Sequence, residues 1–268
     1  AKNEKGYKNL MKISSEAYIN GFYYKPRTDK EFLKNHSEGI ICLSACMQGE
    51  ISRRIIDKEP FENIENAVNS YIEIFGKDDF YIEVQGNGIE GQRELNKKLS
   101  EIAEKFSLKL VATNDTHYVN KGDHTLQDIM ICIQTGAKFS DEKRMRIETD
   151  ELYLKSREEM IESLGEEYTE AVDNTALVSS KCNLSIDFGS FKFPYYKLPK
   201  CVKNTEEFLR KLVYVGIEDR YPNGLTEKIL ERVEYELSVI NKMGYAEYFV
   251  VVCDFIHYAK ENGIPIGP

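Results

Sequence analysis

Short apolar segments alternate with helix-like segments in the first half of this 268-residue chain, and this alternation constrains its fold more than any other feature. Residues 39–45, 80–84 and 108–113 have the apolar character of strands. Between them, residues 64–75 and 95–106 place apolar side chains three or four positions apart, which is the period of an amphipathic helix. Parallel strands need crossover connections of this kind. The sequence therefore predicts an α/β fold with a parallel sheet or barrel.

Helix signals also flank this region. Residues 5–22 carry apolar side chains at helical spacing. Thr28 with Glu31, and Ser156 with Glu159, have the pattern of a capping box, which starts a helix. The other helices predicted in this part lie around residues 126–133 and 171–178.

The helical periodicity stops in residues 183–203, which contain two prolines and extended-looking apolar pieces. We therefore expect a first domain over residues 1–195 and a second over residues 196–268. The second domain is predicted to be mainly helical, because residues 229–240 and 248–259 carry apolar stripes.

Charge and cysteine content limit the class of protein. The chain has 36 basic and 45 acidic side chains, a net charge of −9, so it lacks the basic footprint of a dedicated nucleic-acid-binding domain. Its six cysteines form no C-x-x-C pair, which favours reduced thiols in a cytoplasm. No apolar run approaches the ~20 residues of a membrane span. The absence of an initiator Met, and a C-terminus rich in Gly and Pro, favour a piece of a longer protein.

Three side chains are candidates for metal binding. Asp115 and His117 directly follow a predicted buried strand, and side chains two residues apart in an extended chain point the same way. Cys46 follows another strand and is expected at the same end of the sheet. Cysteine, histidine and aspartate are all acceptable zinc ligands. The alternative is structural: an aspartate that caps the next turn, a partly buried histidine and a cysteine that packs as a small apolar residue.

Several segments, taken together and in order along the whole chain, resemble the bacterial DNA polymerase III alpha subunit family. They include Leu43-Ser-Ala-Cys46, Ala112-Thr-Asn-Asp-Thr-His-Tyr118, Arg144-Met-Arg146, Tyr153-Leu-Lys-Ser156, Met243-Gly-Tyr-Ala-Glu-Tyr-Phe249 and Gly263-Ile-Pro-Ile-Gly-Pro268.

The resemblance implies a fold and a set of ligands. Residues 1–195 would be the later part of a PHP (polymerase and histidinol phosphatase) domain, a partial distorted (βα)7 barrel. Residues 196–268 would be the mainly helical start of the polymerase palm. Cys46, Asp115 and His117 match three of the nine residues that hold divalent metal, zinc or manganese, in family members with an intact PHP site. The remaining ligands of that family site would precede residue 1.

The resemblance also implies an activity. The parent protein would be a replicative DNA-directed DNA polymerase, a nucleotidyltransferase that uses magnesium at a site outside this chain. Its PHP domain would hydrolyse phosphoesters as a 3'-5' exonuclease. Its partners would be DNA, deoxynucleotides, a sliding clamp and a proofreading subunit. This chain would hold no catalytic residue of the polymerase and would be inactive as a polymerase on its own, and its DNA contacts are unassigned. The alternative is a PHP region that acts as a non-catalytic structural and partner-binding module.

Overall fold

The computed structural model describes residues 1–189, 193–194 and 196–267. The chain divides into two compact units, Ala1–Ile186 and Asp187–Pro268, each of which is described by itself. Tyr195, the last residue of the expected first domain, lies outside the described residues, so the expected boundary remains a prediction. Within the described part, no helix is both long and apolar enough to cross a membrane.

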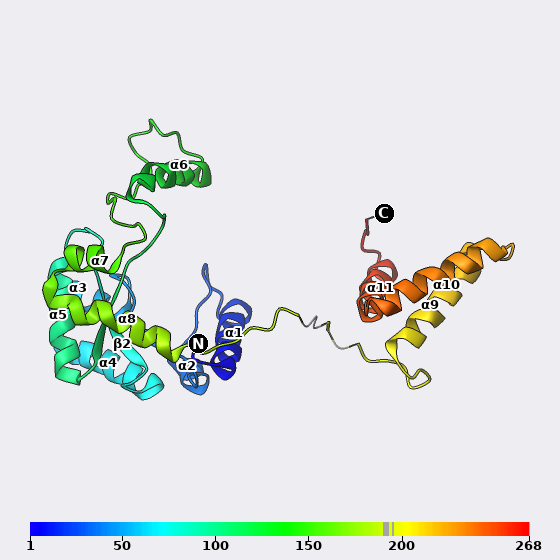
Figure 1. Cartoon of the computed structure of the whole chain (residues 1–268), viewed down its shortest axis with the longest axis horizontal. Helices are drawn as coiled ribbons and strands as arrows, with labels where there is room; N and C mark the ends of the chain where they lie inside the picture. The colour runs from blue at the N-terminus through cyan, green and yellow to red at the C-terminus, as the bar shows by residue number, and fades with distance from the viewer. Residues whose placement is uncertain (190–192, 195, 268) are drawn as a thin grey trace. The chain divides into compact units, whose positions relative to one another are not determined.

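A parallel sheet of three strands lies at the centre of the first unit (Figure 1). Its strands are β1 (Cys42–Leu43), β2 (Phe80–Gln85) and β3 (Lys109–Thr113), in that order. Cys42 pairs with Phe80, and Glu83 pairs with Val111. All six residues of β2 are buried, as expected for a central parallel strand covered on both faces. The predicted parallel strand–helix alternation is therefore confirmed.

Amphipathic helices connect and cover these strands. The crossover from β1 to β2 contains α3 (Glu50–Ile56) and α4 (Phe61–Phe75), and that from β2 to β3 contains α5 (Gln92–Phe106). A later helix, α8 (Thr169–Lys181), packs against β3, where the Asn174 side chain donates to the Leu110 carbonyl at 2.8 Å. Together these elements enclose one core whose most buried members include Val68, Phe80, Ile82, Val84, Leu99 and Ala112.

The first strand is much shorter than the sequence indicates. An apolar strand over residues 39–45 is expected, but only two residues pair, and both are half-buried. A close backbone approach explains the late start: a Cβ on Gly6 would lie 1.9 Å from the Gly39 carbonyl oxygen, and Gly39 has φ +77°. The strand ends early because Ala45 turns at φ +67°.

Two helices precede the sheet. In α1 (Glu4–Ile19), the Asn3 side chain caps the first turn by accepting from the Gly6 N–H. In α2 (Lys30–Asn35), Asp29 is the cap, and it accepts from the Phe32 N–H at 2.7 Å. The capping box expected at Thr28 is therefore wrong by one residue.

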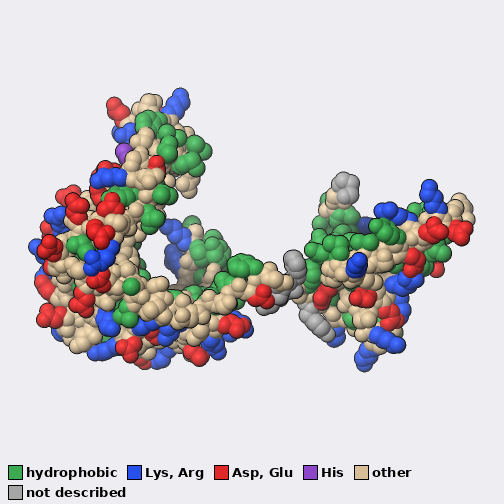
Figure 2. Space-filling model, viewed as in Figure 1, with side chains coloured by type: hydrophobic (Ala, Val, Ile, Leu, Met, Phe, Trp, Pro, Cys, Tyr) green, Lys and Arg blue, Asp and Glu red, His purple; other side chains and the backbone are tan. Residues whose placement is uncertain are grey.

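Between β3 and α8 the chain makes an excursion that carries α6 (His124–Thr135) and α7 (Arg157–Leu164), with short 3-10 turns at Lys121–Asp123 and Glu166–Tyr168. Figure 2 shows apolar side chains gathered on the arm that holds α6. Exposed apolar residues of this arm include Leu126, Met130, Ile133 and Phe139. The capping box predicted at Ser156 and Glu159 is present at the start of α7.

The second unit is helical where it is regular. It contains α9 (Thr205–Arg220), α10 (Glu227–Lys242) and α11 (Ala246–Glu261). Asn204 caps α9 by accepting from the Glu207 N–H at 2.9 Å. The small core of this unit is formed by Leu209, Leu237, Ala246 and Val250.

Candidate metal ligands at the strand ends

Asp115 and His117 lie together immediately after β3. The His117 N–H donates to the Leu152 carbonyl at 2.8 Å, which fixes this loop against a returning segment. Nδ1 of His117 lies 2.7 Å from the Asp115 carbonyl oxygen and 3.8 Å from Asp115 Oδ1. Because a carbonyl oxygen only accepts, Nδ1 carries a proton, and in the neutral ring Nε2 keeps its lone pair. This is the tautomer in which Nε2 of a histidine can bind a metal ion.

Cys46 lies in the turn that follows β1. It is half-buried, and its carbonyl accepts from the Gly49 N–H at 2.9 Å. The turn is tight, since a Cβ on Gly49 would lie 2.3 Å from the Ser44 carbonyl oxygen. Cys46 and Asp115 thus follow the carboxyl ends of the two outer strands, the edge at which ligands bind in parallel sheets.

The three candidates do not form one ligand set. β2 lies between β1 and β3 in the sheet. Among the described residues, no three His, Cys, Asp or Glu side chains gather in a way that could hold a metal ion. Asp115 and His117 are adjacent after β3, and Cys46 follows β1 on the other side of β2.

Glu83 is a polar residue of this sheet edge that the sequence reasoning did not single out. Its side chain is buried on the central strand, with the residue 9% exposed. One carboxylate oxygen accepts from the Ala45 N–H at 3.1 Å, and the other accepts from the Thr113 hydroxyl. The signal was a single charged residue within the apolar segment Phe80-Tyr-Ile-Glu-Val84, since buried charges occur only where partners satisfy them.

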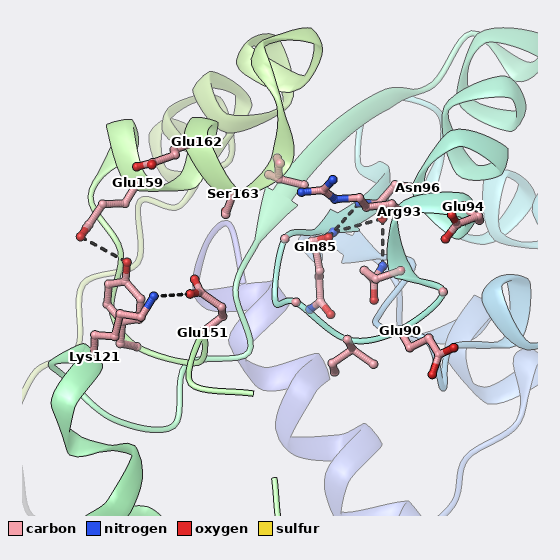
Figure 3. Close-up of a pocket in the computed structure, with 17 residues that line it drawn as sticks. Gln85, Glu90, Arg93, Glu94, Asn96, Lys121, Glu151, Glu159, Glu162 and Ser163 are labelled. Carbon is pink, nitrogen blue, oxygen red and sulfur yellow. Dashed lines mark hydrogen bonds and ion pairs between the residues drawn. The ribbon is translucent and has the colours of Figure 1, made fainter. Parts of the chain in front are cut away.

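A cavity of about 570 Å³ opens beyond the end of β2 (Figure 3). The loop that borders it has the spacing Gly86-x-Gly88-x-x-Gly91 between a strand and a helix, which is the spacing of a dinucleotide-binding loop. Two of these glycines serve packing within the protein. A Cβ on Gly86 would lie 2.7 Å from Ser163 Oγ, and one on Gly88 would lie 3.0 Å from Thr149 Oγ1.

The charge of this cavity also opposes phosphate binding. Its lining includes two cationic side chains, Arg93 and Lys121, of which Lys121 pairs with Glu151. A hydrogen bond from Lys121 outweighs burial and lowers the pKa of the Glu151 carboxyl. The remaining acidic side chains of the lining are Glu90, Glu94, Glu159 and Glu162. This excess of carboxylates repels an anionic ligand.

Comparisons with known proteins cover the whole chain. The PHP domain family matches residues 1–87, and the family described as bacterial DNA polymerase III alpha NTPase domain matches residues 207–268. The DNA polymerase III subunit alpha of Borreliella burgdorferi is 46% identical over 268 residues, which is 100% of this chain and 23% of that protein. That of Treponema pallidum is 43% identical with the same coverage, and that of Aquifex aeolicus is 39% identical over 100% of this chain and 24% of that protein. The chain thus spans about a quarter of the length of these relatives.

Proposed function

Because this chain is homologous along its whole length to a part of the bacterial DNA polymerase III alpha subunits, we propose that it is a segment of a replicative DNA-directed DNA polymerase. The observation that carries this proposal is the match of all 268 residues to relatives of that name. The segment would contribute PHP-domain structure and the start of the region that performs nucleotidyl transfer. Magnesium, deoxynucleotides and the polymerase carboxylates would act outside it.

Primer extension tests this division of labour. The whole subunit that contains this segment should extend a primed template when magnesium and deoxynucleotides are supplied. The 268-residue chain alone should give no product. Template-directed product from the chain alone, or none from the whole subunit, would contradict the proposal.

We further propose that Cys46, Asp115 and His117 are the ligands that this segment contributes to a divalent-metal site for phosphoester hydrolysis, with zinc or manganese as the metal. The proton on Nδ1 of His117 supports this assignment, because it leaves the lone pair of Nε2 available to coordinate a metal ion. The spacing of the three residues around β2 requires further ligands from the rest of the polymerase.

Metal content of the whole subunit tests this assignment. Asp115→Asn with His117→Ala should lower bound zinc or manganese in elemental analysis and abolish 3'-5' exonuclease activity. Asp78→Asn is a matched control, because Asp78 is an exposed carboxylate just before β2, at the opposite end of the strands. Equal metal content in the double variant and the control would show that these residues are not ligands.

A second candidate is a PHP region that serves as a structural, partner-binding module without hydrolysis. It is favoured by the contact of His117 Nδ1 with the Asp115 carbonyl oxygen at 2.7 Å, through which these residues would hold the loop after β3 in place. In this case Asp115→Asn in the whole subunit would lower the melting temperature and leave the exonuclease activity of the preparation unchanged.

The partners of the whole polymerase would be DNA, a sliding clamp and a proofreading subunit, and its location the cytoplasm. This segment should contribute little to DNA affinity, because its net charge is −9. In fluorescence anisotropy at physiological salt, the chain alone should bind a labelled primer–template much more weakly than the whole subunit does. Comparable affinities would instead assign the main DNA contacts to this chain.

A further inference from the structure

We propose that Glu83 is a positioning residue that holds the Cys46 turn and the Asp115–His117 loop at fixed places on either side of β2. This inference rests on the proposed metal function of those three residues. It assigns Glu83 no contact with metal or substrate. The Glu83 carboxylate acts through the backbone of one flanking strand end and a side chain of the other.

The contacts to the β1 side fix a strained turn. Glu83 Oε2 accepts from the Ala45 N–H at 3.1 Å, and the Glu83 N–H donates to Ser44 Oγ at 2.8 Å. Ala45 has φ +67°, a left-handed conformation that disfavours residues with a Cβ. Strained residues of this kind persist only where the surroundings over-determine them. Cys46 is the next residue, so its position depends on this turn.

On the β3 side, Glu83 contacts Thr113, the last residue of that strand, which directly precedes Asn114 and Asp115. Glu83 pairs with Val111, and Thr113 lies two residues further along the same face of the sheet. The Thr113 hydroxyl donates to Glu83 Oε1, and Gln85 Nε2 donates to Thr113 Oγ1 at 3.1 Å and to Glu83 Oε1 at 3.4 Å. The central strand therefore holds the end of β3 through side chains as well as through the backbone ladder.

Charge makes this arrangement demanding. A buried carboxylate is stabilised when several hydrogen-bond donors contact it. If the carboxylate is removed, the buried donors lose their acceptor, which lowers the stability of the fold. The Ala45 N–H and the Thr113 hydroxyl approach one carboxylate from opposite strands, so removal of Glu83 should release both loops together. If Glu83 served only to fill space, its replacement would not loosen these two loops in particular.

Hydrogen exchange of the 268-residue chain, in the presence of a chelator, tests the proposal. Glu83→Ala should speed exchange about tenfold or more in peptides covering residues 44–49 and 114–118, as expected for the loss of a charged hydrogen bond. Glu83→Gln keeps an acceptor for the Ala45 N–H and can donate to Thr113 Oγ1, so it should retain most of the protection. Alkylation of Cys46, followed by mass spectrometry, should accelerate in Glu83→Ala and change little in Glu83→Gln.

Several outcomes would overturn the inference: unchanged exchange in both peptides, acceleration in one of them only, or equal effects of Ala and Gln. If Glu83→Ala does not fold, Thr113→Val replaces it and should accelerate residues 114–118 while residues 44–49 stay protected. No acceleration there would be equally decisive against the inference. Metal content of the whole subunit is a separate measurement. Loop release in Glu83→Ala without any bound metal in the unmodified subunit would refute the metal function and leave the positioning role standing.

Discussion

Cys42 and Cys46 are both half-buried; Cys42 lies in β1 and Cys46 in the turn that follows it. Burial, and then the negative charge of Glu83, raises the pKa of the Cys42 thiol from an ordinary value of 9.0 to about 12. Cys46, in the turn beyond the strand, is the residue that we propose as a ligand. The thiolate is the form that binds metal. Cys42 is therefore the wrong thiol for that role, in agreement with its place inside β1.

The raised pKa of Cys42 predicts a pH dependence of stability. Between pH 9 and pH 12 the unfolded chain loses the Cys42 proton and the folded chain keeps it, so the free energy of unfolding falls as pH rises. Below pH 9 this contribution is fully present. Denaturant unfolding at pH 8 and pH 10 should show a loss of about 1.4 kcal/mol from this group. Cys42→Ala should remove that part of the loss, and an equal loss in both proteins would contradict the assignment.

At the residue scale, the sequence predicted those side-chain positions that depend only on spacing along the chain. The i, i+2 relation of Asp115 and His117 predicted that they lie together, and they do. The association of Cys46 with this pair depends on the width of the sheet between β1 and β3, which spacing along the chain does not report, and it stays a prediction. The role of Glu83 depends on Ala45 and Thr113, which are 38 and 30 residues distant, so only the folded register shows it.

At the scale of elements, one carboxylate joins three helices. Glu50, in the first turn of α3, accepts from Lys30 of α2 at 2.8 Å, from Arg54 at 3.0 Å and from the Tyr71 hydroxyl of α4 at 3.0 Å. Burial alone would raise the pKa of Glu50, but the hydrogen bonds from Lys30, Arg54 and Tyr71 outweigh it and lower the pKa.

Glu50→Gln should therefore destabilise the first unit by about 1–3 kcal/mol at pH 7, the usual worth of hydrogen bonds to a charged group. Because the folded pKa is lowered, the stabilisation is present above the unfolded value of 4.5 and is lost as pH falls through the folded value. Thermal melts at pH 7 and pH 3 should differ less for the variant than for the unmodified chain. Glu104→Gln, an exposed carboxylate on α5, is the control and should leave both melts unchanged.

Elements with a full amphipathic period were predictable, and those set by tertiary contact were not. The periodicity of residues 64–75 and 95–106 indicated α4 and α5 directly. The two-turn helix α3 was missed because seven residues carry too little periodicity. The length of β1 was overestimated because the contact between Gly6 and Gly39 links residues 33 positions apart.

At the scale of the whole molecule, the described residues form two hydrophobic cores. One surrounds the sheet in Ala1–Ile186, and the other joins α9, α10 and α11 in Asp187–Pro268. The two clusters share no residue. Units with their own cores can unfold independently, whereas a shared core imposes a single transition.

Calorimetry of the 268-residue chain should therefore show two transitions. Leu99→Ala removes a side chain that is 1% exposed in the sheet core, and Leu237→Ala removes one that is 4% exposed in the helical core. Each substitution should cost about 2–5 kcal/mol in its own unit, because it leaves a cavity that the surroundings fill only in part. Leu99→Ala should lower the midpoint of one transition alone, and Leu237→Ala that of the other. If either substitution moved both midpoints equally, the two units would unfold as one cooperative body and the independence of their cores would be refuted.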